Sequence, residues 1–258
     1  MTRKMKIVLT VFPVVALVTG VILACVLPGC LMPQIEGKAD SQKETVVFIH
    51  GLQRSGFSMT RLQKRFAEAG YNTLVCTYRS STDAHTISTN LFATLDPLMK
   101  PAPKVHFVTH SMGGILLRDY LKDGHPANLG RTVMLGPPNR GSELIDIFAE
   151  LPGFDPLWGK AGHDLGTGPD SLAVKLPPVD FTCGVIAGDR SITLLSVFIP
   201  GRDDGKVSLT NTFVEGISDR IVLHANHMLM PFSDIVGAEA FHYIQTGSFF
   251  DPDKPDTP

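Results

Sequence analysis

The sequence predicts one α/β domain in which helices flank a mostly parallel central sheet. From residue 45 onward, short β-branched or apolar runs alternate with segments of helical spacing, the pattern of a parallel sheet with helices on its faces. The chain has 258 residues, enough for one such domain and a targeting segment. Its 43% hydrophobic content supports a sizeable core.

The expected elements follow one another along the chain. Strands are expected at residues 45–49, 72–78, 104–109, 131–135, 181–187 and 219–223. Helices are expected at residues 58–69, 84–99, 114–121, 143–148 and 235–245. Pro97 is expected to kink the second helix or end it early. Residues 151–178 are rich in Gly, Pro and Asp and long for a plain connection, so they are expected to form a lid or cap.

The first 36 residues are expected to be a signal or membrane-anchor segment, joined to the domain by a polar linker at residues 37–44. No charged residue occurs from Ile7 to Gln34, and basic residues precede this run, as in export signals and anchors. The most apolar part is about as long as a membrane-spanning helix, which needs about 20 residues, and this favours an uncleaved anchor. The positive flank then predicts that the domain lies outside the cytoplasm, in the cell envelope.

Two other fates of this segment stay open. Cys30 and Cys25 each follow a sequence similar to a lipoprotein processing site, although Pro28 and Leu23 fit its middle position poorly. Simple cleavage would instead give a secreted or periplasmic protein. At the other end, residues 251–258 are rich in Pro and Asp and are expected to be a disordered tail.

Composition excludes several classes of function. The net charge is −2 and no basic stripe is present, so a nucleic-acid partner is not expected. No metal-ligand spacing and no Cys-x-x-Cys occur, and no metal or other cofactor is expected. If the predicted fold is right, several other strands separate those that contain Cys76 and Cys183, beyond the roughly 7 Å reach of a disulfide, so both are expected to be free thiols. Nothing in the sequence indicates an oligomeric state.

Ser111 is the candidate nucleophile. It lies between the strand expected at 104–109 and the helix expected at 114–121, where a nucleophile elbow holds a serine above the carboxyl edge of a sheet. Gly113, which has no side chain, leaves the space that the close crossing of strand and helix needs. Thr109 stands where Gly is usual, which predicts a slightly wider crossing. The plainer alternative is that Ser111 only caps the helix.

These residues resemble a known family. The segment from Val108 to Gly114 is similar to the elbow of bacterial α/β-hydrolase esterases and lipases, nearest to the small lipase and GPI-inositol-deacylase-like group. Residues 48–52 resemble that group's first conserved loop, and residues 136–142 resemble its Pro-Asn-x-Gly-Ser loop. The resemblance covers residues 45–249 and implies an α/β-hydrolase catalytic domain at residues 45–250.

The expected oxyanion hole combines geometry with this resemblance. The backbone N–H of Met112, directly after the nucleophile, should be one donor. The second should come from the loop that carries His50 and Gly51, and the resemblance assigns it to Leu52. Gly51 would let the backbone approach closely. The alternative for His50 and Gly51 is an ordinary turn.

The acid should follow the strand at 181–187, because the family order is serine, acid, histidine. Asp204 is favoured, since the sequence from Asp204 to Val207 resembles the Asp-Gly-x-Val turn that carries the acid in related lipases. Asp189 is the second candidate. Asp203 is interpreted as a solvated turn residue.

The base should follow the strand at 219–223, where His227 and His224 both qualify. His227 is favoured, because it opens an apolar segment as it does in family members. His110, beside the nucleophile, is expected to pack nearby rather than act as the base.

Together these residues predict hydrolysis of an ester or lipid-like substrate through an acyl-enzyme. The same groups would also serve an acyltransferase or a thioesterase. A catalytically silent envelope protein that only binds is the alternative from another class. Apolar residues near the expected lid hint at an apolar substrate, but packing explains them at least as well: Phe148, Leu151, Phe154 and Leu157.

Overall fold

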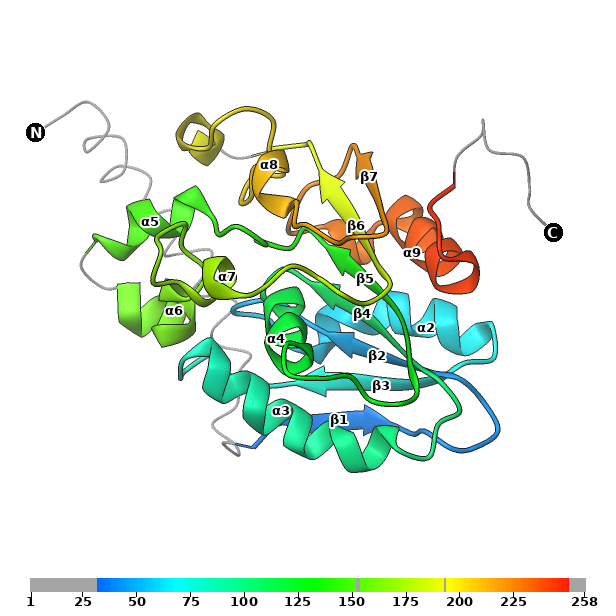
Figure 1. Ribbon diagram of the computed structural model, residues 1–258. Helices are drawn as coiled ribbons and strands as arrows, with labels where there is room; N and C mark the ends of the chain where they lie inside the picture. The colour runs from blue at the N-terminus through cyan, green and yellow to red at the C-terminus, as the bar shows by residue number, and fades with distance from the viewer. Residues whose placement is uncertain (1–31, 152–153, 193, 251–258) are drawn as a thin grey trace, which may run out of the picture. The chain divides into compact units, whose positions relative to one another are not determined.

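The computed structural model describes residues 32–151, 154–192 and 194–250, which form a sheet covered by helices on both faces (Figure 1). The sheet has seven strands in the order β1-β3-β2-β4-β5-β6-β7. β1 pairs with β3 antiparallel, and the other neighbouring pairs are parallel. The strands are β1 (Gln34–Gly37), β2 (Thr45–Ile49), β3 (Asn72–Thr77), β4 (Val105–His110), β5 (Leu129–Leu135), β6 (Cys183–Gly188) and β7 (Asp219–Leu223).

The connections between the strands carry the helices. The α-helices are α2 (Thr60–Glu68), α3 (Ala84–Met99), α4 (Met112–Leu121), α5 (Glu143–Ala149), α6 (Phe154–His163), α7 (Leu172–Lys175), α8 (Leu209–Thr212) and α9 (Asp234–Thr246). Three short 3₁₀ segments are η1 (Gly56–Met59), η2 (Leu194–Phe198) and η3 (Met230–Phe232). Each strand and helix expected from the sequence is therefore present, with shifts of one to a few residues at the ends.

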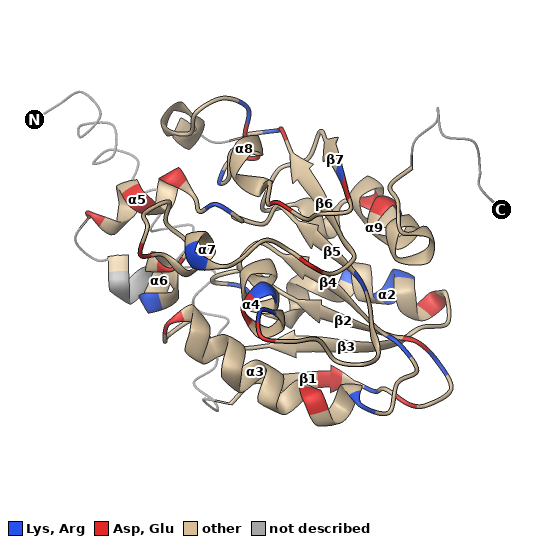
Figure 2. Ribbon diagram, viewed as in Figure 1, with Lys and Arg blue, Asp and Glu red and all other residues tan. Residues whose placement is uncertain are grey.

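The core lies on both faces of the sheet. Along β2, Val46 and Phe48 pack with α2 and α9, whereas Val47 and Ile49 pack with α3 and α4 on the other side. Successive side chains of a strand point to opposite faces, and a parallel sheet covered on both sides therefore needs continuous apolar runs. β2, β3, β4 and β6 accordingly contain no Lys, Arg, Asp or Glu (Figure 2).

Two local features differ from the expectations. β1 includes residues assigned to the N-terminal segment; it has mostly exposed side chains and lacks the apolar run that marks the other strands. α3 does not end at Pro97 but continues to Met99, whose side chain is buried in the core. The N–H of Lys100 donates to the Asp96 carbonyl and closes the last turn.

The region expected to be a lid contains α6 and α7. Gly159, with φ of 65°, interrupts α6. Trp158 stacks on both Phe148 and Phe154, so these aromatic residues pack against one another. The Leu157 side chain lies outside the described part of the chain. That this region acts as a lid stays a prediction.

The thiol prediction is confirmed: Cys76 on β3 and Cys183 on β6 are free and buried. β2, β4 and β5 separate the two strands. The expectations for residues 1–31, with Cys25 and Cys30, and for the tail at 251–258 fall outside the described residues. Among the helices that the structure describes, none combines the length and apolar character needed to cross a bilayer.

Candidate active site

The candidate residues gather at the carboxyl edge of the sheet. After β2 the chain passes to β3 on one side, and after β3 it crosses to β4 on the other, so the order reverses between the adjacent strands β2 and β4. Ligands of open parallel sheets bind beyond the carboxyl ends of the strands at such a reversal. Leu52 follows β2 and Ser111 follows β4, while His227 follows β7.

Ser111 lies on a strained turn between β4 and α4. Its φ of 54° and ψ of −124° are rare for a residue with a side chain, and such strain occurs where function requires it. Its N–H donates to the Leu135 carbonyl at 2.9 Å. The Ser111 side chain makes no cap hydrogen bond to α4, so the interpretation as a simple helix cap is wrong.

Glycines let α4 approach the sheet at this turn. A Cβ on Gly113 would lie 2.5 Å from the Ile49 carbonyl oxygen and 2.8 Å from that of His50, so no side chain fits. Thr109 is fully buried, and a Cβ on Gly114 would lie 3.3 Å from its Oγ1. Because Gly114 has no side chain, α4 has space for Thr109, which is larger than the glycine usual at that position.

A chain of two hydrogen bonds joins the three candidate catalytic side chains. His227 Nε2 lies 3.0 Å from Ser111 Oγ, and His227 Nδ1 lies 2.7 Å from Asp204 Oδ2. A carboxylate accepts, so Nδ1–H donates to Asp204 and the lone pair of Nε2 faces the Ser111 hydroxyl. This is the tautomer in which a histidine can take a proton from a serine.

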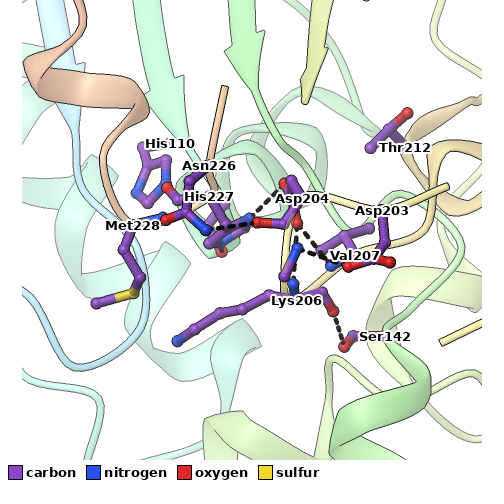
Figure 3. Close-up of polar contacts among 12 residues, drawn as sticks. His110, Ser142, Asp203, Asp204, Lys206, Val207, Thr212, Asn226, His227 and Met228 are labelled. Atoms are coloured by element: carbon purple, nitrogen blue, oxygen red, sulfur yellow. Dashed lines mark hydrogen bonds and ion pairs between the residues drawn. The ribbon is translucent and has the colours of Figure 1, made fainter. Parts of the chain in front are cut away.

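Asp204 is fully buried and held by its own turn (Figure 3). Its Oδ1 accepts from the N–H groups of Lys206 at 3.0 Å and Val207 at 2.8 Å, which leaves Oδ2 for His227. Asn226 Nδ2–H donates to the Asp204 carbonyl at 3.0 Å, and the His227 N–H donates to the same oxygen at 2.8 Å. These bonds fix the acid and the base relative to each other.

The loop after β5 makes room for this pair. Gly136 has φ of 52°, and a Cβ there would lie 3.0 Å from Asp204 Oδ2 and 3.1 Å from His227 Nδ1. A larger residue at position 136 would push the acid and the base apart. Gly136 begins the segment 136–142 that the family resemblance singled out.

The second candidates for acid and base pair with each other instead. His224 Nδ1 lies 3.1 Å from Asp189 Oδ1, and Arg202 also donates to Asp189. Burial works to raise the pKa of Asp189, but the bonds from Arg202 and His224 outweigh it and hold that pKa below its usual value. The His224 side chain is 76% exposed, so this pair lies at the surface. Asp203 is buried, so its interpretation as a solvated residue is wrong; it accepts from Ser196 and from the Gly205 N–H and orders the turn.

His110 packs against the base, as expected. Its ring centroid lies 4.9 Å from that of His227, and its Nε2–H donates to the His227 carbonyl at 3.0 Å. Burial, together with the nearby His227, holds the pKa of His110 well below its usual value. His110 therefore stays neutral and positions the backbone of the base.

The loop after β2 is held by a clamp of His50 and Tyr78. The two rings stack at 4.0 Å, the Tyr78 N–H donates to His50 Nε2 at 3.3 Å, and the Tyr78 hydroxyl donates to the His50 carbonyl. His50 Nδ1–H then donates to the Gly51 carbonyl at 2.8 Å. Burial lowers the pKa of His50 to about 4 and raises that of Tyr78, so both rings stay neutral.

This clamp orients the segment that leads to Leu52. A Cβ on Gly51 would lie 2.9 Å from the Ser111 Cβ, so the loop backbone passes close to the nucleophile. Within the described residues, neither the Leu52 N–H nor the Met112 N–H has a protein acceptor. Met112 is also the first residue of α4, whose N-terminal end favours negative charge.

Tyr78→Phe is expected to lower kcat for an ester about fivefold, with a smaller change in KM. Removing one neutral hydrogen bond to the His50 carbonyl costs about 1 kcal/mol in positioning the loop. Steady-state kinetics of both parameters measure the effect. Tyr120→Phe, which loses a hydroxyl bond to Asp96 on the outer surface, is the matched control and should leave both parameters unchanged. An equal loss of activity in both variants would contradict the clamp.

Several residues of this site were not foreseen. Tyr78 was only the end of an expected strand, and Asn226 and Gly136 had no assigned role. For Gly136 the family resemblance of residues 136–142 was the one sequence feature that could have indicated a role. No sequence pattern pointed to Arg54 or Lys206, which also lie beside the catalytic residues.

Comparisons with known proteins agree on the fold. No protein-family description and no curated protein matched the sequence. Among solved structures, mature Bacillus licheniformis lipase BlEst2 is similar with a TM-score of 0.59 and 20% identity, over 84% of this chain and 98% of the lipase. A structure described under the metagenome-derived lipolytic enzymes LipS and LipT has a TM-score of 0.55 and 17% identity, over 85% of this chain and 99% of the other.

A haloalkane dehalogenase, DpaA from Paraglaciecola agarilytica, is similar as well, with a TM-score of 0.57 and 11% identity, over 83% of this chain and 88% of the other. The chain therefore has the α/β-hydrolase fold, as the sequence predicted. Because that fold serves an enzyme with a different reaction too, activity has to be argued from the site.

Proposed function

We propose that this protein is a serine hydrolase that cleaves carboxylic esters. The observation that carries the proposal is the pair of bonds from Asp204 through His227 to Ser111, 2.7 Å and 3.0 Å long. A serine hydroxyl becomes a strong nucleophile only when a positioned base removes its proton. The lipases and lipolytic enzymes among the structural neighbours fit this activity.

Each catalytic step has a residue to perform it. Ser111 Oγ attacks the ester carbonyl while His227 Nε2 takes its proton, and Asp204 stabilises the imidazolium that forms. The N–H groups of Met112 and Leu52 donate to the oxyanion. His227 then protonates the leaving alcohol, and water attacks the acyl-enzyme by the reverse sequence. These steps need no metal or organic cofactor.

A series of nitrophenyl esters with increasing acyl length tests this proposal. We expect hydrolysis of at least one member with kcat/KM on the order of 10⁴ M⁻¹s⁻¹, within the ordinary range of enzymes. Thioesters and competing alcohol acceptors in the same assay separate an esterase from a thioesterase or acyltransferase with the same residues. If the folded protein hydrolyses none of these substrates, the catalytically silent alternative replaces this one. A shortened chain should start before Gln34, because removal of residues 1–36 would delete most of β1.

We also propose that the segment at residues 1–36 holds the protein in the cell envelope, with the catalytic domain outside the cytoplasm. The support is the uncharged run that follows Arg3, Lys4 and Lys6. Membrane fractionation with an alkaline wash, and the mass of the mature N-terminus, separate a retained anchor from lipidation or cleavage. Recovery of an uncleaved chain in the wash would contradict the anchor.

A further inference from the structure

We propose that Arg54 and Lys206 bind an anionic group, a carboxylate or a phosphate, on the ester that this site cleaves. The inference rests on the proposed function and extends it to a class of substrate. Two cations flank the catalytic residues, and neither forms an ion pair with a carboxylate in the part of the chain that the structure describes.

Arg54 is placed beside the base by a specific contact. It lies two residues after Leu52, and its Nη2–H donates to the Met228 carbonyl at 2.7 Å, on the residue directly after His227. The Arg54 guanidinium therefore links the loop after β2, which carries Leu52, to the loop after β7, which carries His227. Nη2 also makes a long contact, 3.5 Å, to the Met228 sulfur. A guanidinium has five N–H donors, so the donors on Nε and Nη1 remain available to a ligand.

Lys206 is placed beside the acid. Its backbone N–H binds Asp204, and its carbonyl accepts from Ser142 Oγ at 2.7 Å, so the start of the side chain is fixed. In Figure 3 the side chain runs from the Asp204 turn toward the side of the site where Met228 lies. The side chain is solvent-exposed, yet surrounding protein and the charge of Arg54 lower its pKa to about 8. Lys206 thus lies among protein atoms but stays open to a ligand.

Within the described residues, Arg54 and Lys206 form no ion pair, whereas some other cations of this chain do. Arg61, Lys122 and Arg202 each form an ion pair with a carboxylate. Among the described residues, no carboxylate lies within 4.0 Å of the charged groups of Arg54 or Lys206. Asp204 is bound to His227, and Glu143 accepts from Ser208 and Asn211.

An anion between the two cations would relieve their repulsion. Like charges held close together in partly desolvated surroundings destabilise each other, and an oxyanion bound to both removes this cost. Arg forms forked bonds to carboxylate or phosphate, and Lys adds a point charge. A negative group on the substrate would also be drawn toward the site by this local field, despite the net negative charge of the chain.

Matched pairs of neutral and anionic esters test the inference. Nitrophenyl butyrate is compared with the nitrophenyl monoester of succinic acid, and butyryl glycerol with butyryl glycerol 3-phosphate. We expect the wild type to favour the anionic member of at least one pair, and the preferred pair identifies carboxylate or phosphate. Lys206→Gln and Arg54→Gln should each lower the anionic-to-neutral ratio of kcat/KM about tenfold or more, the usual effect of removing a charged hydrogen bond.

Two controls separate charge recognition from a structural effect. Lys64→Gln removes an exposed cation that pairs with Glu68 on α2, and it should leave the ratio unchanged. Raising the salt concentration should reduce the anionic preference of the wild type, because screening weakens charge attraction. An unchanged ratio in both Arg54→Gln and Lys206→Gln, with neutral esters still hydrolysed, would overturn the inference and leave the proposed function intact.

The inference can also be tested if no ester is hydrolysed. In that case calorimetry with succinate and glycerol 3-phosphate measures anion binding directly. Binding by the wild type that weakens about tenfold in Lys206→Gln would support the anion site without the esterase. Absence of binding would overturn the inference, whereas the proposed function would already have failed through the lack of hydrolysis.

Discussion

Replacement of Ser111 by alanine is expected to lower kcat/KM for esters by about 10³- to 10⁶-fold, the range seen when the nucleophile of such a triad is removed. In the proposed mechanism the Ser111 hydroxyl forms the covalent bond with the substrate. Met112, Leu52 and the binding surface remain, so a small residual rate over the uncatalysed reaction should persist. Initial rates on the best ester of the chain-length series measure the loss.

The fold should survive this substitution. Alanine keeps the Cβ that position 111 already accommodates at its positive φ, and the Ser111 side chain makes no bond to α4. Thermal melting of the variant should therefore match the wild type within a few degrees. Ser233→Ala is the matched control, since it removes the cap of α9 and should cost about 1 kcal/mol of stability without loss of activity. Full activity in Ser111→Ala would disprove the proposed nucleophile.

Replacement of His227 by alanine is expected to lower kcat by about 10³-fold or more, whereas His224→Ala should change it less than twofold. Among the described residues, His227 is the one whose side chain forms a hydrogen bond with Ser111 Oγ, and without it no described group can take the serine proton. His224 is exposed and bound to Asp189, so its loss removes a surface pair of small energetic value. Steady-state kinetics of both variants at one pH give the comparison.

A second pair of variants checks the same arrangement from the acid side. Asp204→Asn should reduce kcat strongly, because an amide can hold the imidazole in the wrong tautomer, and Asp189→Asn should not. His227→Gln is measured beside His227→Ala, since alanine leaves Asp204 buried without its partner and can destabilise the fold. Greater losses in the His224 and Asp189 variants than in their counterparts would contradict the assignment.

The sequence predicted the parts of this site that depend on strand ends. The alternation of apolar runs and helical segments placed Ser111 after β4 and His227 after β7, and the parallel sheet brings those ends to one edge. β1 escaped prediction, because an edge strand with exposed side chains has no apolar pattern. The four-residue helices α7 and α8 escaped it as well, since a single turn contains no helical periodicity.

The partners of the catalytic residues depend on contacts between distant segments. Three aspartates and two histidines followed the expected strands. Only the folded chain shows that two of the aspartates pair with the histidines, one pair buried with Ser111 and one at the surface. Tyr78 acts through a backbone carbonyl of another strand end, which no residue pattern reveals. For Arg54 and Lys206 the informative feature is that neither forms an ion pair with a carboxylate of the described residues, and that is a property of the folded structure.

The most direct test of the account is covalent labelling of Ser111 by a fluorophosphonate, read by intact mass and peptide mapping. The account predicts that one equivalent attaches to Ser111, that Ser111→Ala takes up none, and that labelling slows severely in His227→Ala but not in His224→Ala. An unlabelled folded wild type, or attachment at another residue, would contradict the claim that Ser111 is the activated nucleophile.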